Sequence, residues 1–219
     1  MARRSFAGRT VLVTGAGGGL GRALALRFAR AGARIVALDK DAAALDSLRA
    51  DIEGRGGQCL AVPCDVTDAE ACADAVTAAV GRFGSLDVLI NNAGMSQRSG
   101  FAATDLAVIR RVMDVNFHGA VHCTKAALPH LVAVRGLIVA VSSVAGYTPL
   151  IARTGYAASK HAMHGFFESL RTELAPQGVA VMMACPSFIA TNIDRNAIGG
   201  DGRPVRHAQV NIGGRLSPD

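Results

Sequence analysis

Short apolar runs alternate with segments of helical periodicity along most of the chain, and this alternation constrains the fold more than any other feature. Six of the runs have the length of strands. They are residues 10–13, 34–38, 58–62, 87–90, 136–141 and 179–184. Each run is almost continuously apolar, which is typical of strands buried on both faces of a parallel sheet. The sequence therefore predicts an α/β fold, a single doubly wound parallel sheet with helices on both faces.

The segments between these runs carry the periodicity of helices. They are residues 20–31, 42–51, 67–84, 104–131 and 154–174. Thr67 and Glu70 have the spacing of a capping box at the start of the third helix, and Pro129 falls in the last turn of the fourth. Open α/β sheets bind ligands beyond the carboxyl ends of their strands. The candidate site residues at those ends are Gly15, Asp39, Asn91, Ser143 and Ser187.

Length and composition fit one ordinary domain. The chain has 219 residues, of which 50% are hydrophobic and 18% charged, and such a composition excludes a disordered chain. We expect the domain to cover residues 1–195 and a tail of little periodicity to follow at 196–219. The strand candidate in that tail is residues 209–212.

Composition also limits location and partners. No apolar run reaches the roughly 18 residues of a membrane span, and the first ten residues lack the apolar stretch of a secretory signal. We therefore expect a cytoplasmic protein without a membrane partner. The net charge is +6, but the basic residues are scattered, and the chain has two tyrosines and no tryptophan. We expect no nucleic-acid partner, because that would require clustered basic residues with stacking platforms.

The cysteines do not indicate a disulfide framework or a metal site. Their number is odd, and no two have the CxxC spacing. They are Cys59, Cys64, Cys72, Cys123 and Cys185. We interpret them as small hydrophobic residues in a reducing compartment.

A glycine-rich turn follows the first strand. The segment from Thr14 to Gly21 reads TGAGGGLG, in which Gly15, Gly19 and Gly21 fit the pattern TGxxxGxG, whereas GxGxxG cannot be placed. Glycines let a backbone approach a pyrophosphate closely, and the helix that follows offers unpaired N–H groups to it. A purely structural turn is the alternative. The P-loop is excluded because no Gly-Lys-Ser/Thr follows.

Asp39 ends the second strand, 18 residues after Gly21. A carboxylate at this place typically accepts hydrogen bonds from the adenosine ribose, and it would repel the 2′-phosphate of NADP. The sequence therefore favours NAD over NADP, although Lys40 would offset part of that repulsion. The alternative is that Asp39 serves as a helix N-cap near Asp41.

Tyr156 and Lys160 are four residues apart on a predicted helix, so their side chains meet on one face. A phenol has a pKa near 10 and is a poor acid or base at neutral pH. An adjacent ammonium group, with the positive ring of an oxidised nicotinamide, would lower that pKa and let the phenol exchange a proton with a substrate oxygen. A surface pair without a function is the alternative.

Together these motifs resemble the short-chain dehydrogenase/reductase family. The resemblance covers residues 8–195, in the family's order, and Ser143 precedes Tyr156 by 13 residues, which is usual there. The matching residues are Thr14, Gly15, Gly19, Gly21, Asp65, Val66, Asn91, Asn92, Ala93, Gly94, Asn116, Ser143, Tyr156, Lys160 and Pro186. The resemblance implies a Rossmann-like fold. It also implies a further C-terminal strand, which we expect to be missing from this chain.

The resemblance implies a catalytic set. Tyr156 would give or take the proton, and Ser143 would hydrogen-bond the substrate oxygen. Lys160 would hold the nicotinamide ribose and lower the Tyr156 pKa, and Asn116 would anchor a water that links Lys160 to solvent. Asn91 would line the adenosine ribose. The cofactor-binding residues implied are Gly15, Gly17, Gly19, Leu20, Gly21, Asp39, Asp65, Val66, Asn92, Ala93, Gly94, Tyr156, Lys160, Pro186 and Thr191.

The resulting hypothesis is an oxidoreductase that uses NAD, in preference to NADP, to interconvert a secondary alcohol and a ketone. The alternative is a cofactor-binding regulator or scaffold without turnover. The substrate would be a small molecule, and the family resemblance implies a homodimer or homotetramer. The expected pocket wall is Met95, Ser96, Gln97, Thr148, Ile151, Arg153, Phe188 and Ile193. Arg153 would bind a substrate carboxylate or be a solvated surface residue.

One position departs from the family pattern. The family has Pro-Gly after the sixth strand, whereas this chain has Pro186-Ser187. Serine disfavours positive φ, so we expect the local loop to differ.

Overall fold

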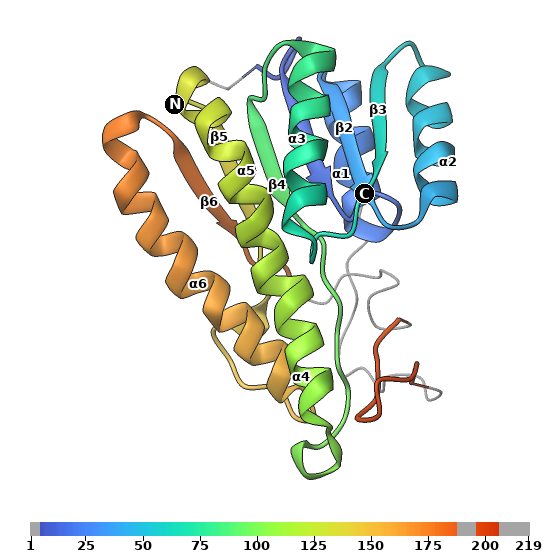
Figure 1. The fold of residues 1–219 in the computed structure, drawn as a ribbon, viewed down its shortest axis with the longest axis vertical. Helices are drawn as coiled ribbons and strands as arrows, with labels where there is room; N and C mark the ends of the chain where they lie inside the picture. The colour runs from blue at the N-terminus through green and yellow to red at the C-terminus, as the bar shows by residue number, and fades with distance from the viewer. Residues whose placement is uncertain (1–4, 188–195, 206–219) are drawn as a thin grey trace.

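A computed structural model describes residues 5–187 and 196–205. In that part of the chain, six strands form one sheet in the order β3-β2-β1-β4-β5-β6, and every pairing is parallel. Figure 1 shows the sheet with β6 at one edge and β3 at the other. The strands are β1 Thr10–Thr14, β2 Arg34–Asp39, β3 Gln58–Pro63, β4 Val88–Asn91, β5 Leu137–Val141 and β6 Ala180–Ala184. The predicted doubly wound parallel sheet is confirmed.

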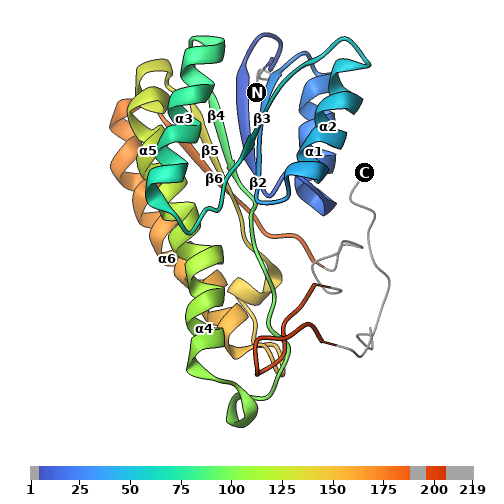
Figure 2. The same ribbon diagram turned by 45° about the vertical axis from the view of Figure 1, so that its right-hand side comes forward.

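Helices cover both faces of the sheet. They are α1 Gly19–Arg30, α2 Ala42–Glu53, α3 Ala69–Phe83, α4 Leu106–Met113, α5 Gly119–Val134 and α6 Thr154–Leu174. Helices α1 and α2 lie on one face, and α3, α5 and α6 lie on the other (Figure 2). In β1, Val11 and Val13 pack under α1 and α2, whereas Leu12 packs under α3 and α5. The strands are apolar on both faces because each face is covered.

The helical stretch predicted over residues 104–131 is confirmed with shifted bounds, from Leu106 to Val134, but its interior is not a regular α-helix. Helix α4 runs into a π-helical segment at Asp114–His118, and α5 continues to Val134 with Pro129 inside it. The bulge lies at Asn116, whose amide binds groups outside the helix. Insertions of this kind are frequent at functional sites.

The predicted capping box at the third helix is also wrong. Asp68 is the N-cap of α3, and its carboxylate accepts hydrogen bonds from the N–H groups of Glu70 and Ala71. Thr67 instead donates its hydroxyl and its N–H to the carboxylate of Asp65. Both Asp and Thr are good N-caps, so spacing alone did not distinguish them.

Residues 196–205 are the described part of the predicted tail. Ala197 and Ile198 are buried, and Ile198 pairs with Gln97 as a short parallel bridge. This stretch therefore packs against the domain, although its sequence has little periodicity. The strand candidate at 209–212 lies outside the described residues.

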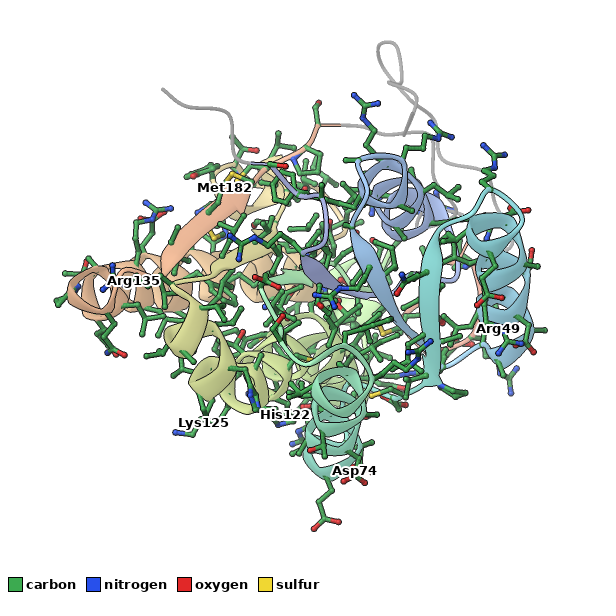
Figure 3. All side chains as sticks on the ribbon, turned by 90° about the horizontal axis from the view of Figure 1, so that it is seen from above. Arg49, Asp74, His122, Lys125, Arg135 and Met182 are labelled. Atoms are coloured by element: carbon green, nitrogen blue, oxygen red, sulfur yellow. The ribbon has the colours of Figure 1, made fainter. Side chains whose placement is uncertain are left out.

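Strand β6 is an edge of the sheet in the described part of the chain. Val181 and Met183 pack toward α6, whereas Met182 is 48% exposed. Figure 3 shows Met182 on the outer strand of the sheet. Across residues 5–187 and 196–205, no helix is both long enough and apolar enough to cross a bilayer.

Candidate active site

A cavity of about 580 Å³ opens at the carboxyl ends of the strands, where the sequence predicted a site. It brings together residues from the first turn, the end of β2, the end of β4 and helix α6. The predicted residues that line it are Gly15, Gly17, Gly19, Leu20, Asp39, Asn92, Ala93, Gly94, Met95, Ser143, Tyr156, Lys160 and Pro186. The described structure thus places most of the predicted cofactor residues around one space.

The glycine-rich turn is held in place by the loop after β4. The Asn92 side chain donates from Nδ2 to the carbonyl oxygens of Thr14, at 2.9 Å, and Gly15, at 3.3 Å. The Thr14 hydroxyl accepts the N–H groups of Asn92 and Ala93, both at 2.9 Å. These contacts leave the following residues of the turn, from Gly17 to Leu20, facing the cavity.

Two glycines of the turn are required by close approach, for different reasons. A Cβ on Gly17 would lie 2.9 Å from Oδ2 of Asp39, on the wall of the cavity. A Cβ on Gly21 would lie 2.0 Å from the carbonyl oxygen of Gly15. Gly21 is not among the described residues that line the cavity. It therefore serves the packing of α1 against the turn.

Asp39 faces the cavity and is oriented by two backbone groups. Its Oδ2 accepts the N–H of Gly17 at 2.9 Å, and its Oδ1 accepts the N–H of Asp41 at 3.1 Å. The N-cap of α2 is Asp41, which accepts the N–H of Ala44 at 3.0 Å. The alternative in which Asp39 caps this helix is therefore wrong, and its carboxylate borders the cavity beside Lys40.

Tyr156, Lys160 and Ser143 lie at the other end of the cavity. Tyr156 and Lys160 are 8% and 4% exposed, so the surface-pair alternative is wrong. The Lys160 ammonium donates to the carbonyl oxygen of Val141 at 3.0 Å and lies 5.8 Å from the centre of the Tyr156 ring. Burial lowers the pKa of Lys160 to about 8. Lys160 thus remains mostly protonated at neutral pH and places a cation beside the phenol.

Asn116 forms hydrogen bonds that connect two of the elements around the cavity. Its Oδ1 accepts the N–H of Met95 at 2.7 Å, and its Nδ2 donates to the Met95 carbonyl at 3.0 Å and to the Ser159 hydroxyl at 2.9 Å. It is buried and is not one of the described residues that line the cavity. In this structure, Asn116 joins the loop after β4 to α6.

Comparison with known proteins agrees with this geometry. A family model described as short chain dehydrogenase matches residues 9–200. The chain belongs to the short-chain dehydrogenase/reductase family. The family resemblance predicted from the motifs is confirmed.

Relatives of the family are similar over most of this chain. Dehydrogenase/reductase SDR family member 7B of Rattus norvegicus is 40% identical over 199 residues, which cover 88% of this chain and 61% of that protein's length. A short-chain dehydrogenase/reductase from Burkholderia phymatum, solved in complex with NAD, has a TM-score of 0.84 at 30% identity and is matched over 88% of this chain and 70% of its own. A metagenomic short-chain oxidoreductase, solved in complex with NADP, has a TM-score of 0.80 at 30% identity, with 84% of each chain covered.

The residues present fit the dinucleotide of this family. Asp39 and Lys160 line the same cavity, and Gly17 lets the backbone of the turn lie directly against Asp39 on its wall. The first residues of α1 border the cavity, and helix N-termini attract phosphates. Asp39 would face the adenosine ribose, and Lys160 would face the nicotinamide ribose.

Some residues implied by the family resemblance lie elsewhere. The Asn91 side chain donates to the Thr124 hydroxyl at 2.9 Å inside the core, so it does not reach the cavity. Asp65 is exposed, and hydrogen bonds from Thr67 lower its carboxyl pKa. Asp65 and Val66 are not among the described residues that line the cavity. Thr191 lies outside the described residues.

The expected pocket wall is confirmed only in part. Met95 lines the cavity, whereas Thr148 and Ile151 are exposed and are not among the described residues that line it. Arg153 is 8% exposed and its guanidinium donates to the Ser96 hydroxyl, which rules out a solvated surface residue. Ser96 and Gln97 are buried. Phe188 and Ile193 lie outside the described residues.

Sequence reasoning missed several lining residues. They are Gly18, Asp41, Ala44, Val141, Ser142 and Asn196, whereas Lys40 and Ser187, which the sequence did single out, also line the cavity. Most of them are neighbours in the chain of a predicted residue, so their place in the sequence could have indicated them. No sequence signal indicated Asn196, because its position depends on how residues 196–205 pack against the domain. Ser187 does not adopt positive φ.

The buried Lys160 predicts a pH dependence of stability. The unfolded state keeps the ordinary lysine pKa of 10.5, whereas burial lowers the folded value to about 8. Between these values the unfolded state binds more protons, so stability rises with pH. Relative to Lys160→Met, the free energy of unfolding should rise by about 2 kcal/mol between about pH 7.5 and about pH 9.5. Urea unfolding of both proteins measures this, and parallel pH curves would contradict it.

Proposed function

We propose that this chain is an oxidoreductase that uses NAD to interconvert a secondary alcohol and a ketone. The observation that carries the proposal is one cavity with Asp39 and the glycine-rich turn at one end and Ser143, Tyr156 and Lys160 at the other. When bound, the nicotinamide supplies the group that accepts or gives the hydride. The protein's part is to position the substrate oxygen and to move its proton.

The residues at the substrate end have complementary chemistry. The Tyr156 hydroxyl exchanges a proton with the substrate oxygen, and Ser143 holds that oxygen with a hydrogen bond. The Lys160 cation stabilises the phenolate form of Tyr156, because a nearby positive charge favours the ionised phenol. The Ser143 Oγ accepts the N–H of Ala145 at 3.2 Å, which leaves its own proton available to a substrate.

Asp39 is the basis for proposing NAD over NADP. Its carboxylate faces the cavity, and a 2′-phosphate near it would be repelled. We expect Asp39→Ala to reduce the preference for NAD by about tenfold, measured as the ratio of the two dissociation constants by fluorescence titration. Asp39→Asn removes the charge but keeps an acceptor for the Gly17 N–H, and it should give most of that change. Equal affinities for NAD and NADP in the unmodified chain would instead assign the choice to Lys40 or another basic residue.

The overall function is tested with a panel of alcohols. Steroids, sugars and aliphatic secondary alcohols are each incubated with the protein and NAD, and NADH is followed by its absorbance. Turnover that depends on Tyr156 supports the proposal. Tight binding of NADH without turnover of any alcohol or ketone would favour the alternative, a cofactor-binding regulator or scaffold.

We also propose a small-molecule substrate, a homodimer or homotetramer and a cytoplasmic location. The family resemblance supports the first two. The cysteines support the third, because all five are free thiols, which is usual in a reducing compartment.

A further inference from the structure

His164 of α6 contacts the turn that carries Ser143, and the proposed chemistry does not use it. Its Nε2 lies 3.0 Å from the hydroxyl oxygen of Ser142. Ser142 is buried at the end of β5, lines the cavity and directly precedes Ser143. The contact therefore joins α6 to the residue next to the one that would hold the substrate oxygen.

Helix α6 holds the end of β5 at two successive residues. Lys160 donates to the carbonyl oxygen of Val141 at 3.0 Å, and His164, four residues further along the helix, contacts Ser142. Residues four apart lie on one face of a helix. The face that presents Tyr156 to the cavity thus also fixes the two residues before Ser143.

The space around the His164 ring is closely fitted. A Cβ on Gly146 would lie 2.4 Å from Nε2, and the Tyr147 ring packs edge-on with its centre 4.1 Å from that of His164. The Cys185 Sγ lies 3.8 Å from the same Nε2. The turn that begins with Ser143 thus includes a glycine where the imidazole needs room.

The surroundings of His164 favour its neutral form. Burial lowers its pKa; Glu168 opposes this change, and His161 and Lys160 add to it. A neutral imidazole has one nitrogen that accepts a hydrogen bond. Nε2 can therefore accept the Ser142 hydroxyl proton.

We propose that His164 is a positioning residue, which accepts the Ser142 hydroxyl and thereby holds the turn at residues 143–146 so that Ser143 faces Tyr156. The inference rests on the proposed function, because it concerns the same substrate oxygen. A displacement of about 1 Å at a catalytic group can cost up to about a hundredfold in rate. Loss of the contact between His164 and Ser142 should therefore lower kcat more than it weakens the binding of substrate or NADH.

The kinetic test uses paired variants. His164→Ala should lower kcat about tenfold and leave the substrate KM and the NADH dissociation constant within about twofold. His164→Gln should recover most of kcat, because its amide can still bond Ser142. The exposed His161, three positions earlier on α6, bonds only its own helix at the Ala157 carbonyl among the contacts described for it, and His161→Ala is the matched control with unchanged kcat.

A double-mutant cycle isolates the contact. Ser142→Ala should lower kcat like His164→Ala, and the double variant should be no slower than either single variant, because both changes remove one interaction. Additive losses would overturn the proposal. So would a His164→Ala variant whose KM rises and whose NADH affinity falls as kcat falls, since that pattern indicates general damage to the site.

A readout without turnover separates this inference from the proposed function. The chain has six histidines, and ring-nitrogen NMR of histidine-labelled protein assigns His164 by the signals lost in His164→Gln. We expect its Nε2 to show an unprotonated, hydrogen-bonded acceptor at neutral pH and to shift in Ser142→Ala. Signals unchanged by Ser142→Ala would overturn the contact, whatever the alcohol panel shows. A shift without turnover of any alcohol would leave the contact standing and reject the proposed function.

Discussion

Replacing Tyr156 with phenylalanine should lower kcat by about a thousandfold while NADH affinity stays within a few-fold. General acid–base catalysis contributes roughly a hundred- to ten-thousandfold to rate, and the change removes only the exchangeable proton. The ring is packed among Val108, Val112, Ala145 and Ile198, so phenylalanine fills the same space. Steady-state kinetics with the best alcohol of the panel, and titration with NADH, measure the two quantities.

Tyr147→Phe is the matched control, since Tyr147 and Tyr156 are the two tyrosines of the chain. Tyr147 is largely exposed, and phenylalanine keeps its ring against His164. Its kcat should stay within about twofold of the unmodified protein. If Tyr156→Phe retained a tenth of kcat, another residue would have to move the proton.

Gly21→Ala should destabilise the protein strongly, whereas Gly18→Ala should not. The new Cβ at Gly21 would lie 2.0 Å from the Gly15 carbonyl oxygen, so backbone must move, while nothing lies within 4 Å of a Cβ on Gly18. Overpacking typically costs 1–3 kcal/mol and sometimes more. We expect Gly21→Ala to lose about 3 kcal/mol in urea unfolding and to weaken NADH binding, because the turn moves with the helix.

Both substitutions remove a glycine from the same turn, so they share the change in chain entropy. Gly18 has an extended backbone that any residue adopts, and Gly18→Ala should stay within about 0.5 kcal/mol. Equal free energies of unfolding for the two variants would show that the backbone of the turn moves at little cost. The packing role of Gly21 would then be wrong.

The strands and the sheet were predictable from sequence because their signal is local. Continuous apolar runs such as Val11–Val13 report burial on both faces, and the order of elements restricts the topology. The π segment around Asn116 was not predictable, because it depends on Met95 and on Ser159, which are distant in the chain. The cap of α3 was missed for a smaller reason, since Thr67 and Asp68 are both able to cap.

The candidate site was also predictable from sequence only in part. The turn from Gly15 to Gly19, Asp39 and the Tyr156–Lys160 pair were identified because each motif is short and its chemistry depends on spacing. The burial of Arg153 and the contact between Ser142 and His164 were missed, because no spacing rule links residues across separate elements. Asn91 was misplaced by resemblance alone, because its neighbour Asn92 is the one that turns toward the cavity.

Ile198 packs beside Tyr156 although the two are far apart in the chain. The wall that keeps water from one side of the phenol ring therefore comes from a segment outside the sheet. Random mutagenesis that aims to change the pH optimum or kcat therefore need not replace the polar residues of the cavity. Changing the size of the side chain at residue 198 would alter the access of water to the Tyr156 ring and the mobility of that ring. Directed evolution at residue 198 could therefore change catalysis without replacing a reacting group.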